Sequence, residues 1–312
     1  MIEPFRPRWP WLGGHLQTVR NQIVQPRHAL PAGERLWLDL GDGDALAASF
    51  HRGAGGTRPL VILVHGLAGA EDSLYLRASA AYLLDAGFPV LRLNLRGTGP
   101  SAPRCCEQYH AGRSEDLRLA LAALPDALAG RGIALVGYSL GGNMLLKFLG
   151  EGAAPKVRAA ASVSAPIDLA DAAATLAAPR NRLYQSWLLA KMREEAWAAP
   201  ITEAERQAVA AARTVIEFDD RYVAPRNGFA SAVDYYARCS ASSFLPRIAV
   251  PTLVIQATND PWIPMTPYDA IDWRAHPALT PLLGAGGHVG FHGAGSIVTW
   301  HDRAIARFLA AI

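Results

Sequence analysis

The sequence has few cysteines, no long hydrophobic run and no strong excess of either charge. Its three cysteines, two of them adjacent (Cys105 and Cys106), form neither a disulfide framework nor the spaced pairs of a metal site. No stretch reaches the roughly 20 apolar residues of a membrane span, and no apolar segment of signal-peptide length lies near Met1. These absences predict a soluble, cytoplasmic protein without a metal site.

Charged residues are also sparse, at 18% of the chain, and the net charge is only +3. Both signs are interspersed, so there is no basic stripe of the kind that binds nucleic acid. Hydrophobic residues make up 51% of 312 residues, which is enough for a large core. We therefore expect a single domain over residues 1–312 and no nucleic-acid partner, while the oligomeric state stays open.

One stretch has the pattern of a buried strand, a sharp turn and a helix. Four apolar residues (133–136) lead into Gly-Tyr-Ser-Leu-Gly (137–141), and apolar residues at helical spacing follow. The glycines two residues before and after Ser139 remove side chains that would collide in a strained turn. Such a turn lifts the Ser139 hydroxyl above the sheet, at a helix start whose N–H groups favour negative charge. Ser139 is a candidate nucleophile, and an ordinary glycine-rich turn is the alternative.

Strand and helix patterns alternate along much of the chain. Apolar strands are expected at 60–64, 90–94, 133–136, 159–164, 252–257 and 280–283, and helices up to about residue 86 and at 114–128 and 295–309. Residues 36–40 and 45–50 predict a hairpin at the sheet edge, and residues 1–34 an irregular arm. Continuously apolar strands between helices indicate an α/β fold with a mostly parallel sheet covered on both faces. Reactive groups of such folds lie beyond the carboxyl ends of the strands.

The alternation stops between Pro166 and about Pro246, where the pattern is helical. We expect residues 167–246 to form a helical cap or lid over the crevice; a helical layer without a lid function is the alternative. An apolar cap of this kind could touch a membrane surface peripherally, although it lacks the basic face typical of such helices.

The nucleophile needs a base, and the base needs a carboxylate that holds its tautomer. Asp260 follows the expected strand 252–257, and His288 follows the strand at 280–283. The chain order Ser139, Asp260, His288 is that of α/β-hydrolases. Asp168, after the strand 159–164, is the alternative acid. Asp116, near the start of a helix, is expected to be a partner of the helix dipole or a cap rather than a catalytic acid.

An attacking serine creates an oxyanion, which requires preorganised N–H donors. The backbone N–H of Leu140, directly after the nucleophile, is one candidate. The N–H of Leu67, in the His-Gly-Leu turn after the strand 60–64, is the other, with a simple tight turn as the alternative reading. This chemistry requires neither a cofactor nor a metal.

Several segments together resemble the YheT-like branch of the α/β-hydrolases, bacterial relatives of eukaryotic abhydrolase lipases and phospholipases. They are residues 13–18, 65–69, 94–97, 137–143 with 146–147, 218–220 with 228–229, 234–236 and 287–291. The resemblance implies an α/β-hydrolase fold and hydrolysis of ester or lipid-like substrates, with Ser139, Asp260 and His288 at the matching positions. Members of that family usually have an aspartate where this chain has Asn259, a change that leaves Asp260 in place.

The expected function is therefore hydrolysis of carboxylic esters of hydrophobic acyl groups through an acyl-enzyme, with a small-molecule ester as substrate. A thioesterase, a lipase or a (lyso)phospholipase would use the same residues. The alternative of another class is a catalytically idle hydrolase fold that binds a ligand, although all three triad positions are filled here.

Overall fold

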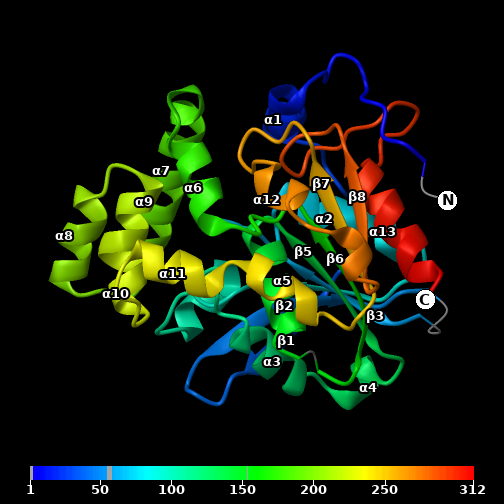
Figure 1. The fold of residues 1–312 in the computed structure, drawn as a ribbon. Coiled ribbons are helices and arrows are strands. Elements are labelled where there is room, and N and C mark those ends of the chain that lie inside the picture. The colour runs from blue at the N-terminus through cyan, green and yellow to red at the C-terminus, as the bar shows by residue number, and fades with distance from the viewer. Residues whose placement is uncertain (1–2, 55–57, 153) are drawn as a thin grey trace.

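The computed structural model describes residues 3–54, 58–152 and 154–312, and its centre is an eight-stranded sheet in the order β1-β2-β4-β3-β5-β6-β7-β8 (Figure 1). The strands are β1 (Glu34–Asp39), β2 (Ala45–His51), β3 (Leu60–Val64), β4 (Val90–Leu93), β5 (Ile133–Tyr138), β6 (Val157–Val163), β7 (Thr252–Ala257) and β8 (Leu279–Gly284). The pairs β1–β2 and β2–β4 are antiparallel, and the remaining pairs are parallel. The expected edge hairpin and parallel sheet are confirmed.

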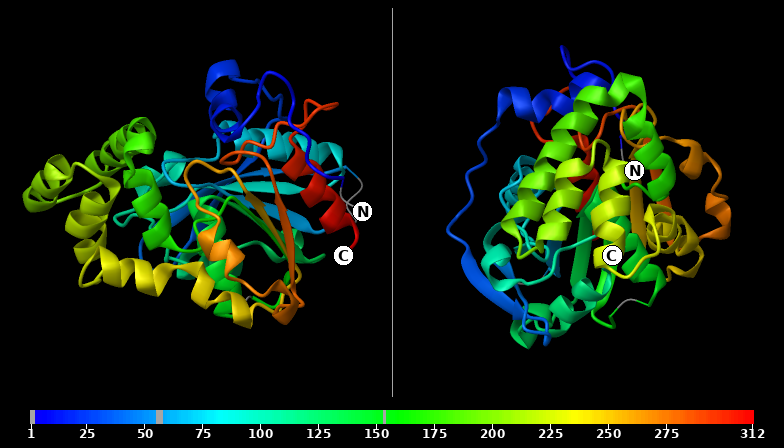
Figure 2. Two further views of the ribbon diagram at one scale, coloured as in Figure 1. Left: turned by 45° about the horizontal axis from the view of Figure 1, so that its top comes forward. Right: turned by 90° about the vertical axis from the view of Figure 1, so that its left-hand side faces the viewer.

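Helices cover both faces of the sheet, because the central strands are apolar on both sides (Figure 2). Val61 and Leu63 of β3 belong to a core cluster that includes residues of α2 (Leu74–Asp85) and α13 (Trp300–Ala310). The alternate residues of β3, including Ile62, belong to a second cluster with residues of α3 (Glu115–Ala122) and α5 (Leu140–Gly150). The period-2 alternation of a strand thus places one sheet between two cores.

Three sequence expectations for the helices were wrong in detail. The helix expected over 114–128 is interrupted between α3 and α4 (Asp126–Ala129), because Pro125 lacks an N–H and disfavours helical geometry in the residue before it. The last helix, α13, begins at Trp300 rather than at 295. The N-terminal arm, expected to be irregular, contains α1 (Gly14–Val24).

Residues 167–246, here called the helical insertion, lie between β6 and β7 and extend to one side of the sheet (Figure 1). Their main helices are α6 (Leu169–Ala177), α7 (Arg182–Ala198), α8 (Glu203–Ala211), α9 (Val215–Phe218), α10 (Ala224–Arg226) and α11 (Ala232–Cys239), with a π-helical turn at Asp219–Val223 between α9 and α10. Four of them start at capping side chains, those of Asp168, Thr202, Thr214 and Ser231. Local sequence thus defines where these helices begin.

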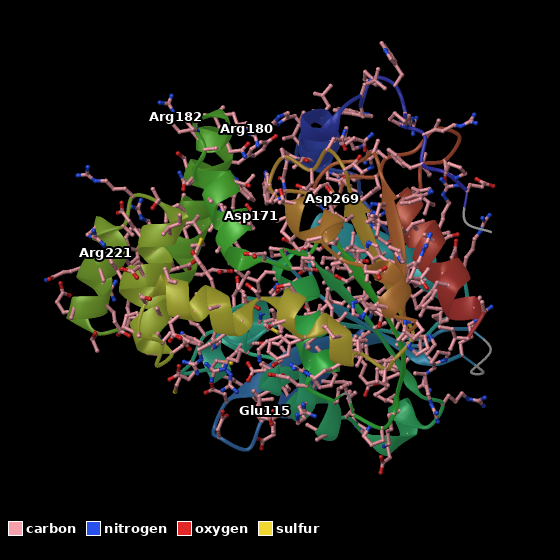
Figure 3. The ribbon with its side chains drawn as sticks, in the orientation of Figure 1. Glu115, Asp171, Arg180, Arg182, Arg221 and Asp269 are labelled. Carbon is pink, nitrogen blue, oxygen red and sulfur yellow. The ribbon has the colours of Figure 1, made fainter. Side chains whose placement is uncertain are left out.

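The helical insertion has an apolar cluster of its own, which includes Leu188, Met192 and Phe218. Leu183 and Trp187, on the same helix α7, are exposed instead, at 82% and 45%. Figure 3 shows Arg182 and Arg221 on the outer side of the insertion, where both are exposed. In the described parts of the chain, no helix combines the length and the apolar character needed to cross a membrane.

Candidate active site

Ser139 lies in a strained turn between β5 and α5. Its φ is 51° and its ψ is −122°, a backbone conformation that residues other than glycine rarely adopt. The glycines around it are needed because the backbone packs too closely for side chains. A Cβ on Gly137 would lie 2.5 Å from the Gly141 oxygen, and a Cβ on Gly141 would lie 2.2 Å from the His65 oxygen. The turn therefore aims the hydroxyl away from the sheet at the start of α5.

The structure brings the side chains of Ser139, His288 and Asp260 together at the carboxyl edge of the sheet. His288 Nε2 lies 2.9 Å from Ser139 Oγ, and His288 Nδ1 lies 2.9 Å from Asp260 Oδ2. The two contacts use opposite ring nitrogens, so the Asp260 carboxyl group at Nδ1 favours the tautomer in which Nε2 accepts the serine proton. The side chains of His288 and Asp260 are only 6% and 0% exposed. This geometry permits proton transfer from the serine hydroxyl.

Asp260 is itself held by the backbone that follows it. Its Oδ1 accepts hydrogen bonds from the N–H groups of Trp262 (2.8 Å) and Ile263 (3.1 Å), which leaves Oδ2 for the imidazole. The Trp262 ring also stacks on the His288 ring with 4.4 Å between centroids. The alternative acid, Asp168, has a different role, because its carboxylate accepts the Asp171 N–H and caps α6.

Leu67 and Leu140, the two expected oxyanion donors, line the same cavity as Ser139 and His288. Neither N–H donates a hydrogen bond to any residue in the described part of the chain. Gly66 brings the first of them close to the nucleophile: a Cβ at position 66 would lie 3.0 Å from Ser139 Cβ. Both residues therefore lie on the cavity wall close to Ser139.

The cavity at this site has a volume of about 890 Å³ and lies between the sheet edge and the helical insertion. The insertion contributes mainly apolar side chains to its wall: Leu169, Ala172, Ala173, Leu176, Leu188, Met192, Val215 and Phe218. Among the described residues, no group of three or more His, Cys, Asp or Glu side chains could hold a metal ion. The arrangement suits a long apolar group attached to a reacting carbonyl.

Asp219, on the insertion side of the cavity, is buried, and desolvation raises the pKa of its carboxyl to about 7. Tyr236 donates its hydroxyl proton to Asp219 Oδ2 at 2.6 Å, which opposes that shift only in part. The folded protein therefore holds a proton there that the unfolded chain releases near pH 4. This stabilising contribution is full below pH 4 and is lost as the pH rises through 7.

We predict that Asp219→Asn, which keeps an acceptor for Tyr236, removes this pH dependence. Relative to the variant, the wild type should lose on the order of 2–4 kcal/mol of unfolding free energy between pH 4 and 8. Urea unfolding of both proteins across the range from pH 5 to 8 measures most of this difference. If the unfolding free energies of the two proteins changed with pH in the same way, Asp219 would not be protonated in the folded state.

Sequence reasoning missed the residues of α1 that hold the histidine loop. Thr18 Oγ1 accepts the His288 N–H at 2.8 Å and donates to the Gly14 oxygen at 2.8 Å. Gln17 is buried and accepts the His292 N–H. Gly14 packs so closely that a Cβ there would lie 1.8 Å from the Asn259 oxygen. The sequence did contain a signal, because these residues belong to the Gly-Gly-His-Leu-Gln-Thr segment (13–18) used for the family resemblance.

We expect Thr18→Val to lower kcat for ester hydrolysis by about 10-fold, because a small misplacement of a reacting group has large kinetic effects. Thr18→Ser keeps the hydroxyl that accepts the His288 N–H and is the matched control. It should retain at least about half of the wild-type kcat, since the hydrogen bond is preserved. A loss in Thr18→Ser together with a fully active Thr18→Val would mean that the methyl contacts of Thr18, and not its hydroxyl, support the loop.

Comparisons with known proteins agree with this fold. A sequence model described as the alpha/beta hydrolase fold matches residues 59–293. The chain is 34% identical over 289 residues to the Escherichia coli protein named "Putative esterase YheT", which covers 89% of this chain and 84% of that protein.

More distant relatives and a solved structure extend the comparison. The chain is 28% identical over 268 residues to a Saccharomyces cerevisiae protein named monoacylglycerol lipase, covering 81% of this chain and 59% of that protein. The structure of the Pyrococcus furiosus esterase Pf2001 superposes with a TM-score of 0.62 at 16% identity, covering 100% of this chain and 98% of that chain, which shows the shared fold. The extent of the family match and the 34% identity together show that the chain belongs to the α/β-hydrolase family, in its YheT-like branch.

Proposed function

We propose that the protein is a serine hydrolase of carboxylic esters with hydrophobic acyl groups. The observation that carries the proposal is the continuous contact from Asp260 through His288 to Ser139 Oγ, at an apolar cavity. The backbone N–H groups of Leu67 and Leu140, which have no acceptor among the described residues, belong to residues that line the same cavity. The names of the relatives, which include an esterase and a monoacylglycerol lipase, support ester hydrolysis in general. The proposal assigns Ser139, His288 and Asp260 as the catalytic triad.

In the proposed mechanism His288 Nε2 takes the proton from Ser139 Oγ as the oxygen attacks the ester carbonyl. The N–H groups of Leu67 and Leu140 stabilise the oxyanion of the tetrahedral intermediate. His288 then protonates the departing alcohol, which leaves an acyl group on Ser139. A water molecule deprotonated by His288 hydrolyses that acyl-enzyme, while Asp260 stabilises the imidazolium that forms in each half-reaction.

The wall provided by the helical insertion supports a hydrophobic acyl group as the bound part of the substrate. In this proposal residues 167–246 act as a cap that excludes water from the reacting carbonyl. The length of the substrate's acyl chain then affects binding mainly through the apolar area that is buried, at about 0.8 kcal/mol per CH₂ group.

The proposal is tested with a fluorophosphonate probe and a panel of p-nitrophenyl esters graded by chain length, together with acyl-CoA and lysophospholipid substrates. We expect covalent labelling of Ser139 and a kcat/KM that rises with acyl length until the cavity is filled. Preferred turnover of acyl-CoA or lysophospholipid would assign a thioesterase or a phospholipase with the same triad. A folded protein that is neither labelled nor active would be a binding protein with a hydrolase fold, and would overturn the proposal.

A further inference from the structure

The turn that carries Leu67 is held by two tyrosine hydroxyls, one on each side of the expected oxyanion donor. The N–H of Gly66 donates to the Tyr75 hydroxyl at 2.8 Å, and the N–H of Ala68 donates to the Tyr109 hydroxyl at 2.7 Å. Ala68 has a φ of 54°, a strained conformation for alanine that these contacts help to maintain. Between the two bonded N–H groups, that of Leu67 has no acceptor among the described residues.

Tyr109 also connects this turn to the helical insertion. Because its oxygen already accepts the Ala68 N–H, its own proton is free to donate, and it does so to Glu195 Oε2 of α7 at 3.0 Å. The neighbouring Gln108 donates its side-chain N–H to the Glu195 backbone oxygen at 3.0 Å. Burial raises the pKa of the Tyr109 hydroxyl well above its ordinary value, so the hydroxyl remains a donor at neutral pH. A chain of hydrogen bonds therefore runs from the insertion to the residue next to Leu67.

We propose that Tyr75 and Tyr109 are positioning residues that fix the Leu67 N–H as an oxyanion donor, and that Glu195 of the helical insertion orients Tyr109 for this purpose. The inference rests on the proposed function, because an oxyanion forms only if Ser139 attacks a carbonyl. Neither tyrosine hydroxyl takes part in the reaction itself; each acts through the backbone of the turn. The position of the helical insertion thereby affects how well the Leu67 N–H stabilises the transition state.

The test compares Tyr75→Phe and Tyr109→Phe with Tyr268→Phe. Tyr268 is a control because its hydroxyl likewise makes a hydrogen bond to the backbone, donating to the Ala165 oxygen at 2.7 Å, and because it is at least as buried as the two partly buried tyrosines of the turn. Removing one oxyanion donor outright costs about 10²-fold to 10³-fold in kcat in other hydrolases, so a loosened donor should cost about 10-fold to 100-fold. We expect this loss in kcat for the first two variants, with KM nearly unchanged and with much smaller effects for Tyr268→Phe.

A second readout separates positioning from general loss of structure. A trifluoromethyl ketone with a medium-length alkyl chain forms a tetrahedral adduct with the serine and places an oxyanion at the donors, whereas the corresponding alcohol binds without one. Affinity for the ketone should fall in parallel with kcat in Tyr75→Phe and Tyr109→Phe, while affinity for the alcohol stays at the wild-type value. Equal losses for the two ligands, or no loss for the ketone, would overturn the inference.

Glu195 provides an independent pair of variants outside the turn. Glu195→Gln keeps an oxygen that accepts from Tyr109 and should retain kcat within about 3-fold, whereas Glu195→Ala removes the acceptor and should lose about 10-fold. Similar kcat values for these two variants would contradict the role of Glu195. Two outcomes separate this inference from the proposed function. A wild-type protein that neither reacts with fluorophosphonate nor hydrolyses esters would overturn both. An active wild-type protein whose tyrosine variants keep the wild-type kcat would overturn the inference alone.

Discussion

Ser139→Ala is expected to lower kcat for ester hydrolysis by at least about 10⁴-fold, the size of effect seen when a serine nucleophile is removed from other triads. Alanine has no oxygen to attack the carbonyl, so no acyl-enzyme can form. The substitution should leave the fold intact, because alanine tolerates the φ of 51° about as well as serine does. Steady-state kinetics with a p-nitrophenyl ester and labelling with a fluorophosphonate probe measure the loss.

Two controls make this result specific. Ser186→Ala, at an exposed position of α7, should keep both labelling and activity. The double variant Ser139→Ala/His288→Ala should be no less active than Ser139→Ala alone, because triad members act as a unit and their effects are not additive. Undiminished labelling of Ser139→Ala would show that another side chain is the nucleophile.

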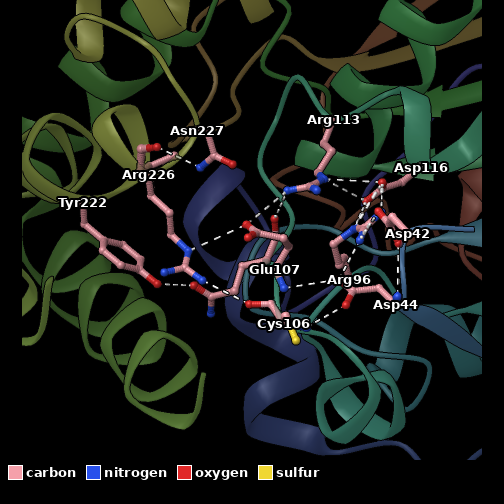
Figure 4. A network of polar contacts seen from close by, with 12 residues as sticks. Asp42, Asp44, Arg96, Cys106, Glu107, Arg113, Asp116, Tyr222, Arg226 and Asn227 are labelled. Carbon is pink, nitrogen blue, oxygen red and sulfur yellow. Dashed lines mark hydrogen bonds and ion pairs between the residues drawn. The ribbon is translucent and has the colours of Figure 1, made fainter. Parts of the chain in front are cut away.

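Arg96→Met is expected to lower the unfolding free energy by about 3–5 kcal/mol, the range found when one member of a buried ion pair is removed. Arg96 is 1% exposed and bonds to Asp44 at 2.6 Å, and to Asp116 at 2.8 Å and 3.0 Å (Figure 4). Methionine fills similar space but leaves the buried carboxylates of Asp44 and Asp116 without Arg96, so that Arg113, at 3.4 Å, is the cation that remains beside Asp116. Urea unfolding at pH 7 measures the difference.

The matched control is Asp42→Asn, since Asp42 also contacts Arg96 at 2.9 Å but is 47% exposed. Its pair with Arg96 should contribute at most about 1 kcal/mol, because water screens exposed ion pairs. A loss below 1 kcal/mol for Arg96→Met would mean that the two buried carboxylates regain water or protons in the variant. The pair of variants thus distinguishes the buried part of this network from its exposed edge.

The Arg96 network also supports the site from a distance. Asp44 accepts the N–H groups of Cys106 and Glu107, and the Arg96 backbone oxygen accepts the Tyr109 N–H at 3.0 Å. The segment that contains Tyr109 is therefore held by hydrogen bonds to the buried Arg96 and to its partner Asp44. Arg96→Met should consequently reduce activity at temperatures where the variant is still folded.

Much of the scaffold was predictable from the sequence, because the patterns that indicate its strands and turns lie within short stretches of the chain. The apolar run 60–64 could only be a strand covered on both sides, and β3 has these bounds. The spacing of glycines around Ser139 follows from steric contacts within one turn. Asp260 and His288 each follow a late strand, and parallel strands end at the same sheet edge, so the sequence alone predicted their proximity to Ser139.

Other features depend on contacts between residues far apart in the chain. Asp116 lies in the first turn of α3, as expected for a partner of the helix dipole, but its pairing with Arg96 has no local signature. The helix α1 was missed because it packs few apolar residues, and its buried positions, Gly14 and Gln17, meet loops about 245 to 275 residues away. Local propensity is a weak guide where tertiary contacts supply most of the stability.

By itself, then, the sequence determined the order of the strands along the chain and the types of side chain at the sheet edge, since these follow from period, sterics and short-range spacing. Only the tertiary structure decided which hydroxyls hold the Leu67 turn, which helix anchors the His288 loop and which acids surround Arg96. Those contacts join segments with no fixed spacing between them, and their free energy comes from burial and from hydrogen bonds that form only when the whole chain has packed.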